Sequence, residues 1–156
     1  MAGASIKAIN TGIQDNLTAM LDRQHSMQAY LDRIVYRQYQ NAQRERWMSE
    51  GASEGVPWDS LNPAYASRKL IKFASYDGGG RKMLIATGRL FKSVIGPGED
   101  HQKVATNDEL TVSWSTEYAP YVNQRRTFDL FSLPTMEKMY DGLARFLILG
   151  IMRDTY

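Results

Sequence analysis

The side chains that could act as nucleophiles or general bases form no familiar catalytic pattern. The chain of 156 residues has no cysteine, and its two histidines, His25 and His101, lie far apart in the sequence. Residues 51–55, GASEG, match the letters of GxSxG but lie in an expected loop instead of a strand-to-helix turn, and the chain has no SxxK motif and no HExxH spacing for zinc. We expect His25 to be exposed or interfacial and His101 to be solvated, so neither is a good general base.

Paired carboxylates could support glycoside hydrolysis, but nothing in their spacing selects a pair. The acidic residues expected in loops or at edges are Asp59, Asp77, Glu99, Asp100, Glu117 and Asp129. Acidic residues in loops are ordinary surface residues in most proteins. We therefore expect no enzymatic activity, no metal and no cofactor, and keep a hydrolase as a rival hypothesis.

A glycine-rich segment could cradle a phosphate group. It consists of Tyr76, Asp77, Gly78, Gly79, Gly80, Arg81 and Lys82. A nucleotide-binding P-loop needs Ser or Thr directly after its lysine, whereas Lys82 is followed by Met83. Three successive glycines restrain the backbone very little, so we expect a mobile loop rather than a nucleotide site.

Positive charge is concentrated in the middle of the chain. The protein has 19 basic and 17 acidic side chains. Between Arg68 and Lys92 there is one acid, Asp77, against seven bases, namely Arg68, Lys69, Lys72, Arg81, Lys82, Arg89 and Lys92. The sequence favours a solvated face, because no aromatic RNA-binding pattern accompanies the charges. A small nucleic-acid-binding protein that uses this stretch remains the alternative.

The N-terminal third predicts an unusually long helix. Its apolar residues recur at helical spacing, at Ile6, Ile9, Ile13, Leu17, Met20, Met27, Leu31 and Ile34. We expect one helix over residues 5–50, or two nearly collinear helices, with a bend at Gly12 or at His25–Ser26. About 40 helical residues would reach roughly 60 Å, so part of this stripe meets another copy or folds back across its own sheet.

The order of the predicted helices and strands indicates a single α+β domain over residues 1–156. It has a long N-terminal helix over 1–50 and a core of loops, short helices and a hairpin over 51–133. After a loop over 51–63, Pro63 opens a short helix over 64–73. Thr87 is the predicted N-cap of a second one, which turns Leu90 and Val94 inward. Gly96–Gly98 ends that helix. The pattern over 103–106 and 110–115 indicates an antiparallel hairpin.

Three further features complete the sequence-based picture. In the hairpin, Leu110, Val112 and Trp114 should face the core. Pro120 favours an edge strand or a turn. A C-terminal helix over 134–153 ends in residues 146–152, which are apolar on every side and should be buried by a neighbouring subunit. This run is too short to span a bilayer, and the first 16 residues lack a signal-type apolar run, so we expect no membrane contact.

Three blocks of the sequence together carry a family resemblance. They are PWDSLNPAYASRK at 57–69, LIATGRLFKSV at 84–94 and EYAPYVNQ at 117–124. In this order the chain resembles the tailed-phage virion-morphogenesis, or tail-completion, family. The matching positions are Trp58, Leu61, Pro63, Tyr65, Lys69, Leu84, Thr87, Gly88, Leu90, Ser93, Tyr118 and Ala119. Family members usually place a histidine and then a glycine turn after the third block, and residues 121–126 have neither.

The resemblance implies a non-enzymatic structural part of a bacteriophage virion. It would form a homo-oligomeric ring, six-fold in the family picture, at the neck, joining the head connector to the tail. Double-stranded DNA would pass through with weak contact only. The location would be the virion, and the host cytoplasm during assembly. A tail terminator or a head-completion ring is the alternative within this class.

The resemblance also implies roles for particular residues. Trp58, Leu61, Tyr65 and Leu90 would stabilise the subunit, and Thr87–Gly88 would set a helix start. The glycine-rich loop over 76–82 would contact a neighbouring ring or the lumen.

Overall fold

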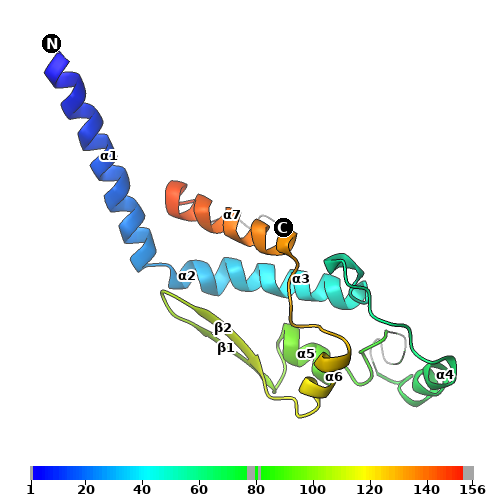
Figure 1. The fold of residues 1–156 in the computed structure, drawn as a ribbon. Helices are drawn as coiled ribbons and strands as arrows, with labels where there is room; N and C mark the ends of the chain where they lie inside the picture. The colour runs from blue at the N-terminus through cyan, green and yellow to red at the C-terminus, as the bar shows by residue number, and fades with distance from the viewer. Residues whose placement is uncertain (1, 77–79, 81, 153–156) are drawn as a thin grey trace.

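The computed structural model describes residues 2–76, 80 and 82–152, and the fold is α+β, as predicted (Figure 1). The helices are α1 (Ala2–His25), α2 (Gln28–Tyr30), α3 (Tyr36–Met48), α4 (Pro63–Lys72), α5 (Arg89–Ile95), α6 (Ala119–Arg125) and α7 (Leu133–Leu149). A π-helical turn, Leu31–Val35, joins α2 to α3, and a 3-10 turn, Ala52–Glu54, follows α3. Strands β1 (His101–Ala105) and β2 (Leu110–Trp114) form an antiparallel hairpin.

The predicted long helix is broken where its sequence allowed a bend. Helix α1 passes through Gly12 and ends at His25, and the chain becomes helical again at Gln28. The Ser26 hydroxyl donates to the carbonyl oxygen of Asp22 at 2.9 Å, a side-chain bond that often bends helices. Figure 1 shows α1 leaving the direction of α2 and α3 at a wide angle. The bend at His25–Ser26 is confirmed, and the expectation of near-collinear helices is wrong.

The two parts of this broken helix have different surroundings. The π-helical turn and α3 lie over the hairpin and α5. Gln28 fastens the start of this part to the hairpin turn, since its Nε2 donates to Ala105 O at 2.9 Å and its backbone N–H to Asn107 Oδ1 at 3.3 Å. Helix α1 instead extends away from the body, with only its C-terminal end beside α7 (Figure 1).

The main core surrounds Trp47 of α3. Its ring centroid lies 5.7 Å from that of Trp58 and 5.6 Å from those of Phe91 and Phe128. The buried members of this core are Trp47, Trp58, Ile85, Leu90, Val94, Ile95, Ala119 and Phe128. They join α3, α5, α6 and the loop after α3 into one body.

A smaller core fixes α7. Tyr30 and Phe146 stack with centroids 4.4 Å apart, and Ile34 is buried with them. At the other end of α7, the buried carboxylate of Glu54 accepts from the backbone N–H of Ser132 at 2.6 Å and from the Thr135 hydroxyl at 3.0 Å. This acceptor satisfies polar groups at the helix start, where a negative charge is favourable.

The hairpin follows its predicted alternation. In the register that pairs Lys103 with Val112, the residues Leu110, Val112 and Trp114 are half-buried while Thr111 and Ser113 are exposed. Because the inner face is only half-buried, the sheet shields one side of the core rather than forming its centre.

Two helix boundaries differ from those predicted, and one helix, α6, was not predicted. Gly88, at φ +81°, is the N-cap of α5 instead of Thr87, although the Thr87 hydroxyl accepts the Arg89 N–H at 3.3 Å. Pro120 lies in the first turn of α6, not in an edge strand or a turn, because a proline at that position gives up no helical hydrogen bond. Helix α7 ends at Leu149, where Gly150 adopts φ +69°.

Other local predictions are confirmed. Helix α4 begins at Pro63, and the Asn62 side chain accepts the Ala64 N–H at 3.0 Å. Leu90 and Val94 of α5 are buried. Within the described part of the chain, no helix has the length and apolar character needed to cross a membrane.

Candidate functional site

The positions that carry the family resemblance divide into a buried and an accessible set. Trp58, Lys69, Gly88, Leu90, Ser93 and Ala119 are buried. Leu61 and Leu84 are half-buried, and Pro63, Tyr65, Thr87 and Tyr118 are exposed. Tyr65 is 49% exposed, so the expectation that it packs the subunit is wrong, whereas it is confirmed for Trp58 and Leu90.

Most of the accessible set comes together in one groove of about 700 Å³. The groove is lined by Leu61, Tyr65, Met83, Leu84, Tyr118, Tyr121, Val122, Gln124, Arg125 and Arg126. Its walls therefore come from α4, from α6 and from the segment before α5. We call it the tyrosine groove. Tyrosine, methionine and arginine are the side chains enriched in protein interfaces, and none of the described residues that line the groove carries a carboxylate.

Two cations fix the walls of the tyrosine groove. Arg126 donates from Nη2 to Asp59 O at 2.9 Å, and its Nε lies 3.1 Å from the sulfur of Met83. Lys69 of α4 is buried, and its Nζ donates to the carbonyl oxygens of Lys82 and Met83. Burial lowers the pKa of Lys69. Both side chains are bound to backbone carbonyls, so the groove is largely preformed.

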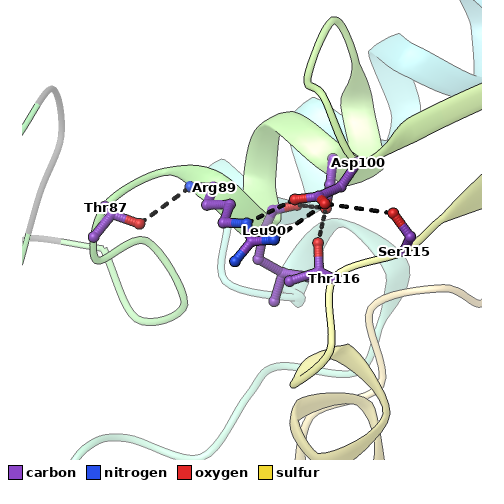
Figure 2. A network of polar contacts seen from close by, with 7 residues as sticks. Thr87, Arg89, Leu90, Asp100, Ser115 and Thr116 are labelled. Carbon is purple, nitrogen blue, oxygen red and sulfur yellow. Dashed lines mark hydrogen bonds and ion pairs between the residues drawn. The ribbon is translucent and has the colours of Figure 1, made fainter.

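A polar network ties α5 to the hairpin (Figure 2). Arg89 donates to both carboxylate oxygens of Asp100, at 2.7 Å and 3.1 Å, and the Ser115 hydroxyl adds a long contact at 3.4 Å. The hydrogen bonds from Arg89 hold the pKa of Asp100 below its ordinary value. Figure 2 also shows the Thr116 side chain in contact with the carboxylate of Asp100. A carboxylate with this many partners has a structural role.

The structure places Ser93 near a histidine without activating it. His101 bonds through Nδ1 to the carbonyl oxygen of Ser93 at 2.7 Å, and its Nε2 pairs with the Tyr36 hydroxyl at 2.8 Å. The Ser93 hydroxyl donates to Leu90 O and accepts from Thr116. A serine nucleophile needs a base beside its hydroxyl, and none of the described residues places one beside that of Ser93. His101 is half-buried, so the expectation that it is solvated is wrong, whereas His25 is exposed.

The basic stretch over 68–92 does not form a continuous free patch. Lys69 is buried, Lys82 donates from Nζ to Met48 O at 2.7 Å, and Arg89 is paired with Asp100. Arg68, Lys72 and Lys92 are exposed, and Arg81 lies outside the described residues. Several charges that a phosphate backbone would need are thus engaged within the subunit.

The glycine-rich segment is only partly described. Asp77, Gly78, Gly79 and Arg81 lie outside the described residues, so the mobile-loop prediction is not tested on them. Tyr76 is exposed and Lys82 is half-buried. Gly80 is buried at φ +76°, where a Cβ atom would lie 2.7 Å from Leu70 Cα. Its N–H donates to Ile85 O at 3.2 Å, so Gly80 belongs to the body and faces α4.

A second unpartnered surface runs along α1, which we call the arm. Ile13, Leu17 and Leu21 follow one another at four-residue steps and are 51%, 54% and 55% exposed. We call these three residues the arm stripe. Arg23, at the base of the arm, donates to Leu147 O at 2.8 Å and Ile148 O at 2.9 Å.

The apolar end of α7 is only partly covered. Phe146 is buried, but Ile148, Leu149, Ile151 and Met152 remain exposed in the subunit. The prediction that residues 146–152 are buried on all sides is therefore not met within one chain. Burial by a neighbouring subunit stays a prediction.

Among the residues that the structure describes, no three His, Asp or Glu side chains are grouped so that they could hold a metal ion. Comparisons of this chain with protein families, with curated proteins and with solved structures find no match.

Proposed function

We propose that this protein is a structural subunit of a tailed-phage neck, a tail-completion component that forms a ring around the DNA channel. The proposal rests first on the three sequence blocks at 57–69, 84–94 and 117–124, in their order along the chain. The observation that carries it in the structure is the arm, a long helix that leaves its own body with an apolar stripe uncovered.

An uncovered apolar stripe favours assembly. Exposed apolar side chains at successive turns of one helix face gain free energy when another surface covers them. The distance of the arm from the main core leaves that covering to another molecule. A tail terminator or a head-completion ring would use the same property, and they are the alternatives in this class.

The polar clusters support a structural role rather than turnover. The Arg89–Asp100 pair, the buried Lys69 and the Ser93–Thr116 bond each have their partners within the subunit. They hold elements together, and none presents a free nucleophile beside a base. A ring of this kind should let DNA slide, so weak and salt-screened contact is what we expect.

The test is the native mass of the purified protein by light scattering at rising concentration, with negative-stain images of the same sample. A closed ring with a central hole wide enough for duplex DNA is the expected result. A protein that stays monomeric at every concentration, or assembles without a hole, would contradict the proposal.

The nucleic-acid-binding rival is tested separately. A triple variant that neutralises the exposed Arg68, Lys72 and Lys92 should leave assembly unchanged, whereas that rival requires it to abolish tight, salt-dependent DNA binding.

A further inference from the structure

We propose that the arm stripe of one copy binds in the tyrosine groove of the next copy, which makes a head-to-tail contact. This inference rests on the proposed ring and names the two surfaces that build it. Ile13, Leu17 and Leu21 form the ridge, and Leu61, Tyr65, Leu84, Tyr118 and Tyr121 form the receiving surface.

The two surfaces suit each other in shape. Apolar side chains at four-residue steps along one helix face are the anchors with which a helix binds a groove. The tyrosine groove offers an apolar floor with aromatic walls, since Tyr65 is 49% exposed, Tyr118 40% and Tyr121 73%. Tyrosines of this kind provide much of the contact energy in protein interfaces.

The groove and the arm also carry exposed charges of opposite sign. The groove carries Arg125 and Arg126 without a carboxylate among its lining residues. On the described side chains of the arm, the acids Asp15 and Asp22 are exposed, while Arg23 is already bound to carbonyl oxygens of α7. At 100° per residue these acids lie on the side of α1 opposite the arm stripe, so they add long-range attraction toward the groove and form no direct pair with it.

The geometry excludes the occupation of the groove by its own arm. Arg23 holds the base of the arm to the end of α7, at the N-terminal side of α3. The tyrosine groove involves α4, which lies beyond the other end of α3, and α6, which lies beside α5, and the arm points away from both (Figure 1). A second copy is thus the occupant that the chain itself supplies.

A contact between two different surfaces of one chain has a definite consequence for symmetry. It leaves one free stripe and one free groove at the ends of every open oligomer, and only a closed ring satisfies all of them. One helix in one groove is a small interface, so isolated pairs should be weak and ring closure should stabilise the assembly strongly.

The experiment uses one variant on each surface of the full chain. Leu17→Glu disables the stripe and Tyr121→Glu disables the groove, and both side chains are exposed, so the fold should be kept. Each variant should be monomeric where the unmodified protein is a ring, with at least a roughly 30-fold weaker contact, as for the loss of an interface hot spot. The matched controls are Thr18→Glu, about 100° round the same helix, and Tyr140→Glu on α7, and both should still assemble.

Mixing the two variants gives the decisive result. The intact groove of the Leu17→Glu chain can bind the intact arm of the Tyr121→Glu chain once and no further, so native mass spectrometry at protein concentrations high enough to occupy a single weak contact should show a one-to-one heterodimer and nothing larger. If the Tyr121→Glu variant still forms rings, or the mixture gives no heterodimer, the inference is wrong while the neck proposal stands. If the heterodimer forms but the unmodified protein builds open filaments, the inference holds and the neck proposal fails.

Discussion

The body around Trp47 and the arm are made from one nearly continuous run of helix, yet they are stabilised in different ways. In the body, Trp47 is 1% exposed and contacts three other aromatic rings. In the arm, Leu17 is 54% exposed, and its stripe neighbours Ile13 and Leu21 are exposed to the same degree. The same helical pattern thus serves folding after the bend and, in our proposal, assembly before it.

Replacing Trp47 with alanine gives the largest effect. Removing a buried indole from the main core should lower the free energy of unfolding by about 4 kcal/mol. Denaturant titration followed by circular dichroism measures this. Leu17→Ala is the matched change in the arm and, measured at concentrations where the subunits are dissociated, should stay within about 0.5 kcal/mol of the unmodified protein. An equal loss for both variants would break the comparison, because the arm would then belong to the cooperative core.

The anchor of α7 should give an intermediate effect. Glu54→Ala leaves the Ser132 N–H and the Thr135 hydroxyl without their acceptor, and should cost about 2 kcal/mol. Thermal melting checks the loss, and Glu45→Ala on the exposed side of α3 is the control. An unchanged melting temperature for Glu54→Ala would mean that α7 is held by the Tyr30–Phe146 stack alone.

The same anchor should weaken in acid. Burial raises the pKa of Glu54, but the hydrogen bonds from Ser132 and Thr135 and the charge of Arg46 outweigh it, and the net pKa is lowered. A lowered pKa in the folded state stabilises the protein above the ordinary glutamate value, and the effect is lost as the pH falls through the lowered one. The stability gap between the unmodified protein and Glu54→Ala should therefore be constant from pH 7 to about 5 and close below about 4.

The junction of the arm should give the smallest effect on global stability. Arg23→Ala removes two bonds to the last carbonyl groups of α7, worth about 1 kcal/mol or less. Amide hydrogen exchange should become faster in α1 and in the last turn of α7, and stay unchanged around Trp47. Gln24→Ala, beside it and exposed, should change neither region. Faster exchange throughout the body would show that arm and core unfold together.

Local signals predicted the elements well where one residue type decides the backbone. Pro63 predicted the start of α4, the alternation over 110–115 predicted β2, and the His25–Ser26 pair predicted the bend. The prediction of an edge strand or a turn at Pro120 was wrong, because a proline fits the first turn of a helix as readily as a turn or an edge strand.

The tyrosine groove could not be predicted from local signals. Its walls meet only after α6 and α4 are brought together by the contacts of Arg126 and Lys69 with distant carbonyl groups. A buried lysine is rare, and nothing in the spacing of Lys69 marks it as buried. The motif residues Leu61, Tyr65 and Tyr118 were visible in the sequence, but whether they line a core or a surface depends on that tertiary placement.

A small rotation at the short joint Ser26–Met27 would move the far end of α1 by several ångströms. A helix of 24 residues is about 36 Å long, so a rotation of about 10° at its base moves the tip by about 6 Å. Four hydrogen bonds therefore set the direction of the whole arm: two from Arg23 on one side of the joint and two from Gln28 on the other. In a closed ring built through the arm, this direction sets the turn from each copy to the next. The number of copies would then depend on four hydrogen bonds that lie outside the two surfaces that touch.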